Sequence, residues 1–248
     1  MAARSIIKKG DTFIVRDGEC VVLRYVDTHS IKVKFTATGF VTWCHGSALR
    51  NGNVKDPLAP SLVGVGCFGV GPYQGSYSEN GRKVRTRHYT AWQSMLIRCY
   101  SGHPKFATGY AGCTVSERWQ NFQNFAHDIE QMPNWDTPGY ELDKDIIKLG
   151  NKVYSRKRCC FVPREINGAL VRSNTGGGAT VLPNGKWRAR ISNGYGKGMI
   201  HLGCFDTREE ALAVYAVGKR KRLHALARQY KDQLDPRAYK ALIRYRVQ

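Results

Sequence analysis

Acidic side chains are scarce in this 248-residue chain. It has 19 Asp and Glu against 39 Lys and Arg, which gives a formal net charge of +20 and an isoelectric point near 9.8. The chain is also 42% hydrophobic and 11% aromatic, which excludes a disordered basic tail because such tails lack the apolar residues of a core. A folded chain this basic is typical of nucleic-acid binders, although a basic protein without a polyanionic partner fits the charge alone.

Long apolar runs and paired cysteines are absent too. No stretch of about 18 apolar residues occurs and the N-terminus has no apolar signal core, so we expect a soluble, intracellular (cytoplasmic) chain with no membrane partner. The eight cysteines form no C-x-x-C pair or regular framework, which argues against structural zinc and a disulfide scaffold. We expect reduced, mostly buried thiols, with the adjacent Cys159 and Cys160 in a strand.

The positive charge is concentrated in the last third of the chain. Residues 1–64 carry a net charge of +4, residues 65–168 of +5 and residues 169–248 of +11. The strand, helix and turn patterns along the chain predict a multi-domain α+β fold. Its expected parts are a small β-barrel, a Gly-rich linker, a central module, a domain of one three-stranded sheet plus a helix, and a basic helical tail, at 1–64, 65–84, 85–168, 169–217 and 218–248.

Residues 1–64 predict a small antiparallel barrel. Apolar runs of about five residues alternate with polar turns, as strands joined by tight turns do. The pattern is that of an SH3-like barrel, a scaffold that serves many functions, and RNA binding through it is one alternative. The predicted strands lie at 12–15, 20–23, 31–35 and 39–43.

Two helical segments are predicted after the linker. Apolar residues from Trp92 to Cys99 recur at i, i+3, i+4 and i+7, and residues 119–129 repeat that spacing. We expect the aromatic residues of both segments in the core, with base stacking as the alternative.

Residues 140–168 combine acids, carboxamides and hairpin signals. They predict a strand, a Gly-Asn turn, a short basic segment, a second strand and the start of a helix. Asp143 and a second acid flank Lys144, and Asn151 and Asn167 follow. Oxygen-bearing side chains that converge on such a ββα hairpin can hold a magnesium-type ion, which polarises a phosphodiester. Alternatively, the acids pair with neighbouring lysines and Asn151 supplies a turn residue.

Residues 176–217 predict three strands and an amphipathic helix. Turn signals, among them a Gly-rich turn from 193 to 198, separate the strands. Alternation on the second strand places Trp187 on the face toward the helix and Arg188 and Arg190 on the open face. A cationic sheet face fits the major groove of DNA, where Arg reads guanine, although a sheet used only for packing has the same pattern.

The central module resembles HNH-type homing endonucleases encoded by phages. The likeness rests on residues 140–168, on W-Q-S-M-L-I-R-C-Y at 92–100 and on V-S-E-R-W at 115–119. It implies an HNH-like catalytic set and a divalent metal, magnesium, held by the first and last members of that set. The implied catalytic residues are Asp143 at the acidic position, Lys144 at the place of the general-base histidine, Asn151 in the loop and Asn167 at the last ligand position.

Lys144 departs from the HNH pattern. A lysine near its ordinary pKa of about 10.4 is protonated at neutral pH and cannot accept a proton from water. Three alternatives follow: a desolvated Lys144, a module that binds without cutting, or a substitute base among His88, His103 and His127.

The C-terminal sheet resembles the ethylene-response-factor (apetala-two) DNA-binding domain. The likeness rests on G-K-W-R-A-R-I at 185–191 and H-L-G-C-F-D-T-R-E-E-A-L-A-V-Y at 201–215. That domain also occurs fused to HNH homing endonucleases. The first strand departs from the family pattern, so direct readout of bases is expected to be thinner. The resemblance implies DNA contacts by Arg188, Arg190 and His201. The expected DNA-binding set also includes Thr180, Lys186 and Ser192.

A basic run follows this domain. Placed after a sheet that reads DNA, it is expected to contact phosphate, although a charge run is often only a solvated face. Asp235-Pro236 predicts the cap and first residue of a last helix. The expected phosphate contacts are Lys219, Arg220, Lys221 and Arg222.

These patterns together predict a protein that binds double-stranded DNA. The leading interpretation is a site-specific homing endonuclease that hydrolyses phosphodiester bonds with a divalent metal and without a small-molecule cofactor. The alternative is a non-catalytic DNA-binding regulator or accessory protein with a nuclease-derived centre.

Overall fold

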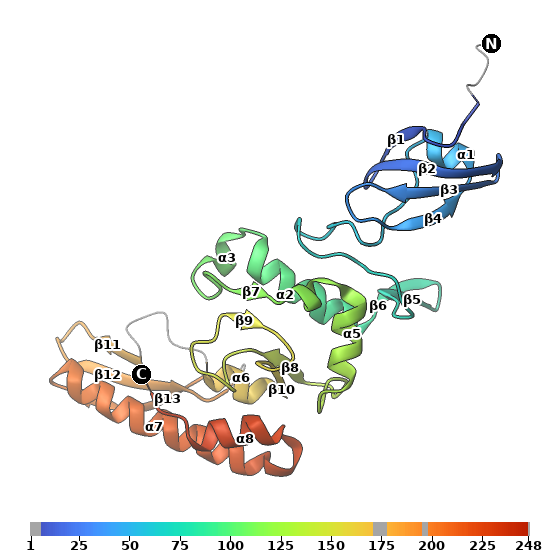
Figure 1. Ribbon diagram of the computed structural model, residues 1–248. Helices are drawn as coiled ribbons and strands as arrows, with labels where there is room; N and C mark the ends of the chain where they lie inside the picture. Colours follow the sequence, from blue (N-terminus) through green and yellow to red (C-terminus); the bar gives the residue numbers. More distant parts are fainter. Residues whose placement is uncertain (1–5, 171–177, 195–197, 248) are drawn as a thin grey trace. The chain divides into compact units, whose positions relative to one another are not determined.

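The computed structural model describes residues 6–170, 178–194 and 198–247 (Figure 1). With 33% helix, 28% strand and several small sheets, it confirms a mixed α+β fold. The start of the predicted C-terminal segment at 171–177 and the centre of the Gly-rich turn at 195–197 lie outside the described residues. The chain forms two compact units, the first Met1–Pro104 with Glu117–Ala126 and the second Lys105–Ser116 with His127–Gln248.

An antiparallel four-stranded sheet begins the first unit, and it confirms the four predicted strands. Within the described residues β1 and β4 are the edges and do not pair, so the sheet is open rather than closed into a barrel. Its apolar face packs around Phe35 of β3 and Leu49 of α1. The elements are β1 (Thr12–Val15), β2 (Gly18–Asp27), β3 (Ser30–Phe35), β4 (Val41–Cys44) and α1 (Gly46–Arg50).

Aromatic residues form the remaining core of the first unit. Trp92 of α2 donates its indole N–H to the carbonyl of Trp119 at 2.9 Å, and both residues are 1% exposed. The prediction that these aromatic residues belong to the core is therefore confirmed. A hairpin precedes this core, and the elements are β5 (Ser76–Glu79), β6 (Arg82–Arg85) and α2 (Arg87–Tyr100).

The single helix predicted at 119–129 is two helices, α4 (Glu117–Gln120) and α5 (Phe122–Glu130). Asn121 separates them because its Oδ1 accepts the backbone N–H of Gln123 at 2.9 Å, as a capping residue does. The main chain of Asn121 also pairs with Cys67, so part of the predicted linker is ordered.

Two short sheets build the centre of the second unit. β8 (Tyr140–Asp143) pairs antiparallel with β10 (Cys160–Pro163), as predicted, and α6 (Arg164–Leu170) follows. The sequence did not predict β9 (Val153–Tyr154), which pairs parallel with β7 (Thr114–Val115).

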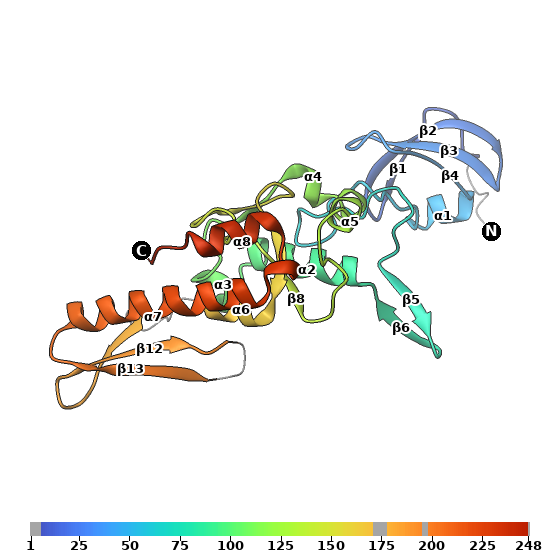
Figure 2. The same ribbon diagram turned by 90° about the horizontal axis from the view of Figure 1, so that it is seen from below.

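The C-terminal sheet and its helix form as predicted. Ala189 and Ile191 of β12 pack against Ala211 and Tyr215 of α7, which lies along one face of the sheet (Figure 2). A capping box starts α7, in which the side chain of Thr207 and the side chain of Glu210 each accept the other's backbone N–H. The elements are β11 (Ala179–Val181), β12 (Trp187–Ser192), β13 (Met199–Phe205) and α7 (Arg208–Gln229).

The predicted basic tail shares a core with the predicted central module. Leu223 and Leu226 of α7 pack with Val162 and Ile166 in one apolar cluster, which also includes residues of α8 (Pro236–Ile243) and lies close to the short helix η2 (Lys231–Gln233). Asp235 caps α8 by accepting the N–H of Arg237 at 2.8 Å, which confirms the predicted cap.

All eight cysteines are free thiols, and four of them are buried. β10 begins at Cys160, so the prediction of a strand is right for Cys160 and wrong for Cys159. Burial raises the pKa of Cys159 to about 12. Among the described residues, no helix is both long and apolar enough to span a membrane.

Candidate nucleic-acid interface

Asp143 is the last residue of β8 and organises the turn that follows. Its Oδ1 accepts the backbone N–H of Asp145 at 2.7 Å and that of Ile146 at 2.8 Å. Burial raises the pKa of Asp143 above its ordinary value, although the two N–H donors act in the opposite direction. One oxygen of the predicted metal ligand is thus already occupied by main-chain donors.

Lys144 is a buried cation. The residue is 5% exposed, and its ammonium lies 2.6 Å from Asp145 Oδ2 and 3.2 Å from the carbonyl of Asn151. The rings of Tyr110 and Tyr154 face it at 5.9 and 6.0 Å. Burial alone would lower the pKa of Lys144, but the hydrogen bond and charge of Asp145 outweigh it, so the pKa lies above its ordinary value. The general-base position therefore holds a protonated ammonium.

Asn151 ties the hairpin loop together. Its side-chain amide donates to the carbonyl of Lys144 at 2.9 Å and to that of Val153 at 2.8 Å. Main-chain carbonyls at both ends of the loop are thereby satisfied in a buried position. The loop-fixing role that the HNH resemblance implies for Asn151 agrees with these contacts.

Asn167 binds a residue that the sequence did not single out. Its amide donates to Glu141 Oε2 at 2.7 Å, and Arg164 donates to Glu141 Oε1 at 2.9 Å. No local pattern pointed to Glu141, because only the packing of α6 against β8 brings Arg164 and Asn167 to it.

The side-chain oxygens of this centre are poorly arranged to coordinate a divalent cation. Asp143 Oδ1 already accepts two N–H groups, and the Lys144 ammonium occupies the space beside Asp145. No group of three or more His, Cys, Asp and Glu with the spacing of metal ligands occurs within residues 6–170, 178–194 and 198–247. Magnesium at Asp143 and Asn167 stays a prediction.

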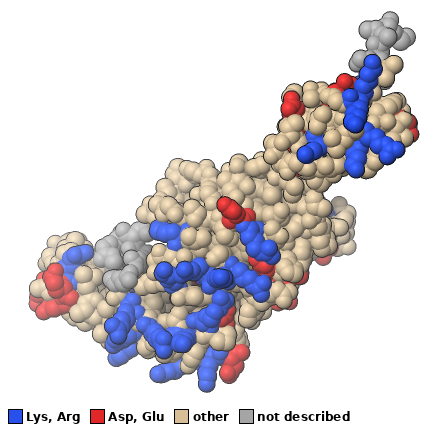
Figure 3. Space-filling view, viewed as in Figure 1, with Lys and Arg blue, Asp and Glu red and all other residues tan. Residues whose placement is uncertain are grey.

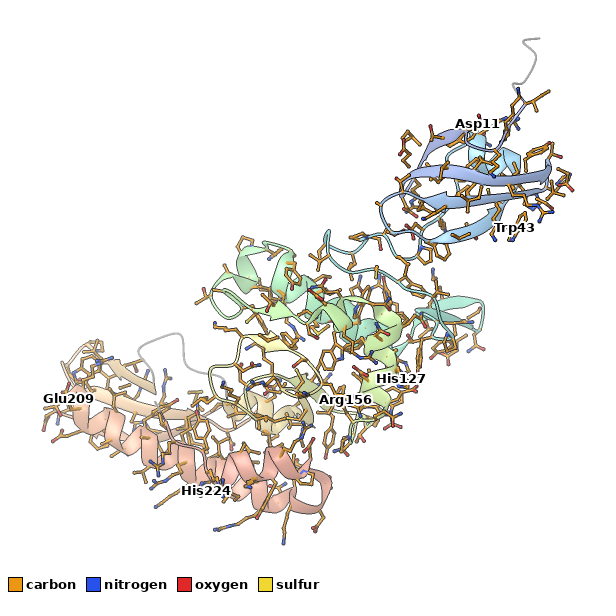
Figure 4. The ribbon with its side chains drawn as sticks, in the orientation of Figure 1. Asp11, Trp43, His127, Arg156, Glu209 and His224 are labelled. Atoms are coloured by element: carbon orange, nitrogen blue, oxygen red, sulfur yellow. The ribbon has the colours of Figure 1, made fainter. Side chains whose placement is uncertain are left out.

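Of the three candidate substitute bases, only His127 belongs to the same unit as this centre. His88 and His103 belong to the first unit, and His127 is an exposed residue of α5 (Figure 4). In the described part of the second unit, no hydrogen bond or ion pair joins His127 to Asp143.

The outer face of the C-terminal sheet carries the predicted arginines. Arg188 lies opposite Thr180 on β11 and Cys204 on β13, and Arg190 lies opposite the exposed His201. Arg188 Nε and Thr180 Oγ1 are both shielded from solvent and have no hydrogen-bond partner among the described residues. Buried polar atoms of this kind are rare and need an explanation.

A β-bulge sets which residues face outward at the far end of the sheet. The register of β12 and β13 shifts between Ala189 and Arg190, next to Gly203, whose φ is +135°. The extra residue on β13 lets Leu202 pack toward α7 while His201 stays on the outer face.

Two of the predicted DNA-binding residues make local contacts instead of lying free. Ser192 Oγ accepts the N–H of Gly194 at 3.1 Å, and Lys186 Nζ lies 3.2 Å from Asp206 at the solvent-exposed end of the sheet.

The predicted phosphate contacts of the basic run fall into two classes. Lys219 is 4% exposed and donates to the carbonyl of Leu170 and the hydroxyl of Tyr215, so expecting it on the surface was wrong. Arg222 is half-buried and pairs with Glu165 at 2.8 Å. Only Arg220 and Lys221 are exposed, because they lie on the side of α7 that faces away from the core.

A basic pocket lies between α7 and the end of the chain. It has a volume of about 510 Å³ and is lined by Arg220, His224, Ile243, Arg244, Tyr245 and Arg246. Figure 3 shows Lys and Arg side chains gathered over this part of the molecule. His224 Nε2 is shielded and has no hydrogen-bond partner within the described residues. His224 was not singled out from the sequence.

No protein-family model, curated protein or solved structure matches this chain. Function is therefore inferred from the residues themselves.

Proposed function

We propose that this chain binds double-stranded DNA through the outer face of the sheet β11-β12-β13. The observation that carries the proposal is that Arg188 and Arg190 of β12 share with the exposed His201 of β13 the face of this sheet that α7 does not cover. The guanidinium N–H groups of these arginines can donate hydrogen bonds to a base edge or to a phosphate.

Arg190 and His201 extend the same face along β12 and β13. Arg donates two hydrogen bonds to O6 and N7 of guanine in the major groove, and an exposed imidazole donates to a phosphate or a base. Because α7 covers the opposite face, the sheet enters a groove with its cationic side only.

The basic pocket supplies phosphate contacts for the same partner. Arg220, Arg244 and Arg246 bring three guanidinium groups to one concave surface, and each neutralised phosphate releases counterions. Lys221 adds an exposed cation on the same helix. These contacts strengthen binding to every sequence alike.

For the central hairpin we favour a non-catalytic role, so that the chain acts as a DNA-binding regulator or accessory protein. Lys144 is a protonated, hydrogen-bonded cation, Asp143 Oδ1 binds two main-chain N–H groups, and Asn167 binds Glu141. Each contact stabilises the hairpin and none leaves a base ready to take a proton.

A site-specific homing endonuclease is the second candidate. The contacts of Asn151, which tie both ends of the loop, favour it because the HNH resemblance implies this role. In that candidate Asn167 would have to release Glu141 to hold magnesium together with Asp143. We also propose an SH3-like fold for residues 1–64, with an open sheet in place of a closed barrel.

A plasmid assay separates the two candidates. The full chain is incubated with supercoiled plasmid and magnesium or manganese, next to Asp143→Ala and Asn167→Ala. We expect all three proteins to retard the plasmid in a gel without nicking it. Metal-dependent nicking by the wild type that both variants lose would establish the endonuclease, and a wild type that fails to retard duplex DNA at low salt would overturn DNA binding.

A further inference from the structure

The solvent-facing side of the N-terminal sheet carries an exposed tryptophan among cations. Trp43 of β4 is 51% exposed, and the Lys32 ammonium lies 5.8 Å from the centre of its ring. The opposite side of the sheet, with Val33 and Phe35, is the buried core of these strands. With Val41 of the same strand, which is 39% exposed, the ring forms an exposed apolar strip beside a cation, a combination that sites for stacked bases use.

The strand register arranges this face in rows. Arg24, Lys32 and Trp43 lie side by side on β2, β3 and β4, and Val21, Lys34 and Val41 form the next row. Three cations therefore lie on the same face as the ring and a small apolar strip, within three neighbouring strands. Strands lie about 4.8 Å apart, so phosphates that follow one another along a chain can meet successive cations.

We propose that this face of β2-β3-β4 binds single-stranded nucleic acid, with one unpaired base stacked on Trp43 and the flanking phosphates on Arg24, Lys32 and Lys34. The positive charge of this face favours a polyanionic ligand. The exposed ring selects unpaired bases, because the bases of a duplex are already stacked on each other and offer no free face.

The residues of this site differ from those of the proposed duplex surface. It lies in the first unit, whereas β11, β12 and β13 belong to the second. Stacking on an aromatic side chain tolerates every base, so the site discriminates strandedness and not sequence.

The test uses the full chain and a fluorescein-labelled oligothymidylate of about 12 nucleotides. Trp43→Leu should weaken its binding roughly tenfold, since stacking on one base contributes about that factor, whereas Trp43→Phe should stay close to the wild type. Tyr77→Leu is the matched control, because Tyr77 is an aromatic residue of the same unit that is 48% exposed. Its binding should not change.

A charge variant adds a second measurement. Lys32→Ala/Lys34→Ala should lower the salt slope of oligothymidylate binding by about 1.4, since each phosphate contact on a single strand contributes about 0.7. Arg188→Ala/Arg190→Ala should lose duplex affinity and keep oligothymidylate affinity, which separates this site from the proposed duplex surface.

Three results would overturn the proposal. Trp43→Leu could bind oligothymidylate as the wild type does or no more weakly than Tyr77→Leu. It could lose affinity for a duplex and for oligothymidylate equally, which would assign the face to double-stranded DNA. It could change the sedimenting mass of the free protein, which would assign the face to a contact between copies of the chain.

Discussion

The Lys144 ammonium lies 2.6 Å from the Asp145 carboxylate, and the two partners differ sharply in their access to water. The Lys144 side chain is 6% exposed and that of Asp145 is 44% exposed. The ammonium therefore depends on the carboxylate for its charge compensation, whereas the carboxylate is solvated on its other side.

This asymmetry predicts that Asp145→Ala destabilises the chain more than Lys144→Met. Removing Asp145 leaves a buried charge without its partner and should lower the free energy of unfolding by about 3 kcal/mol. Removing Lys144 loses hydrogen bonds to a solvated acid and should cost about 1.5 kcal/mol. Urea unfolding of the two variants measures both values, and the reverse order would contradict a buried, dependent ammonium.

The same pair predicts a loss of stability at alkaline pH. Because the pKa of Lys144 is raised in the folded chain, its contribution is complete below the ordinary lysine pKa of about 10.4 and disappears as the pH rises through the folded value. Subtracting the unfolding free energies of wild type and Lys144→Met at each pH isolates this contribution. A difference that stays constant above pH ~10.4 would refute it.

Two substitutions of Asp143 should affect the stability of the chain differently. Because the pKa of Asp143 is raised in the folded chain, its charged form lowers the free energy of unfolding at pH values above the ordinary Asp pKa of about 3.9. This destabilisation disappears as the pH falls to that value. Asp143→Asn keeps the oxygen that accepts two N–H groups and should be at least as stable as the wild type at neutral pH. Asp143→Ala should lose about 1–2 kcal/mol. Thermal melts of both variants measure these stabilities. An equal loss of stability in the two variants would contradict a capping role for Asp143.

Substitutions in the basic run at 219–222 should affect either DNA binding or stability, depending on whether the side chain is exposed or buried. Arg220→Ala/Lys221→Ala removes exposed cations and should lower the salt slope of duplex binding by about 1.8, or about 0.9 for each phosphate contact. Lys219→Met should leave the slope unchanged and lower the melting temperature instead, because Lys219 is bound to Leu170 and Tyr215. Titrations at several salt concentrations measure the slope. A drop in slope for Lys219→Met would place its ammonium on DNA after all.

Local patterns predicted most of the elements. Alternation on β12 gave the correct inner face, and Asp235-Pro236 gave the start of α8. Within the basic run, however, all four side chains have similar chemistry, and their fates depend on where α7 packs. Lys219 lies four residues after the buried Tyr215 on the same helix face, and that spacing was the available signal.

Contacts between residues far apart in the chain could not be predicted from the sequence. Arg222 pairs with Glu165, which is 57 residues away, and β9 has only two residues and pairs with a distant strand. No local propensity encodes such pairings. At the centre, the sequence located Asp143, Asn151 and Asn167 but not the contact of Asn167 with Glu141, since only the packing of α6 against β8 brings them together.

Binding of duplex DNA by the outer face of β11-β12-β13 can be tested with two charge-matched double variants. Arg188→Ala/Arg190→Ala removes two cations from that face, and Arg82→Ala/Lys83→Ala removes two exposed cations from the hairpin β5-β6. Both are titrated against random-sequence duplex DNA. We predict a loss of at least roughly tenfold for the sheet variant and little change for the hairpin variant. Equal losses for the two variants would contradict duplex binding by that face.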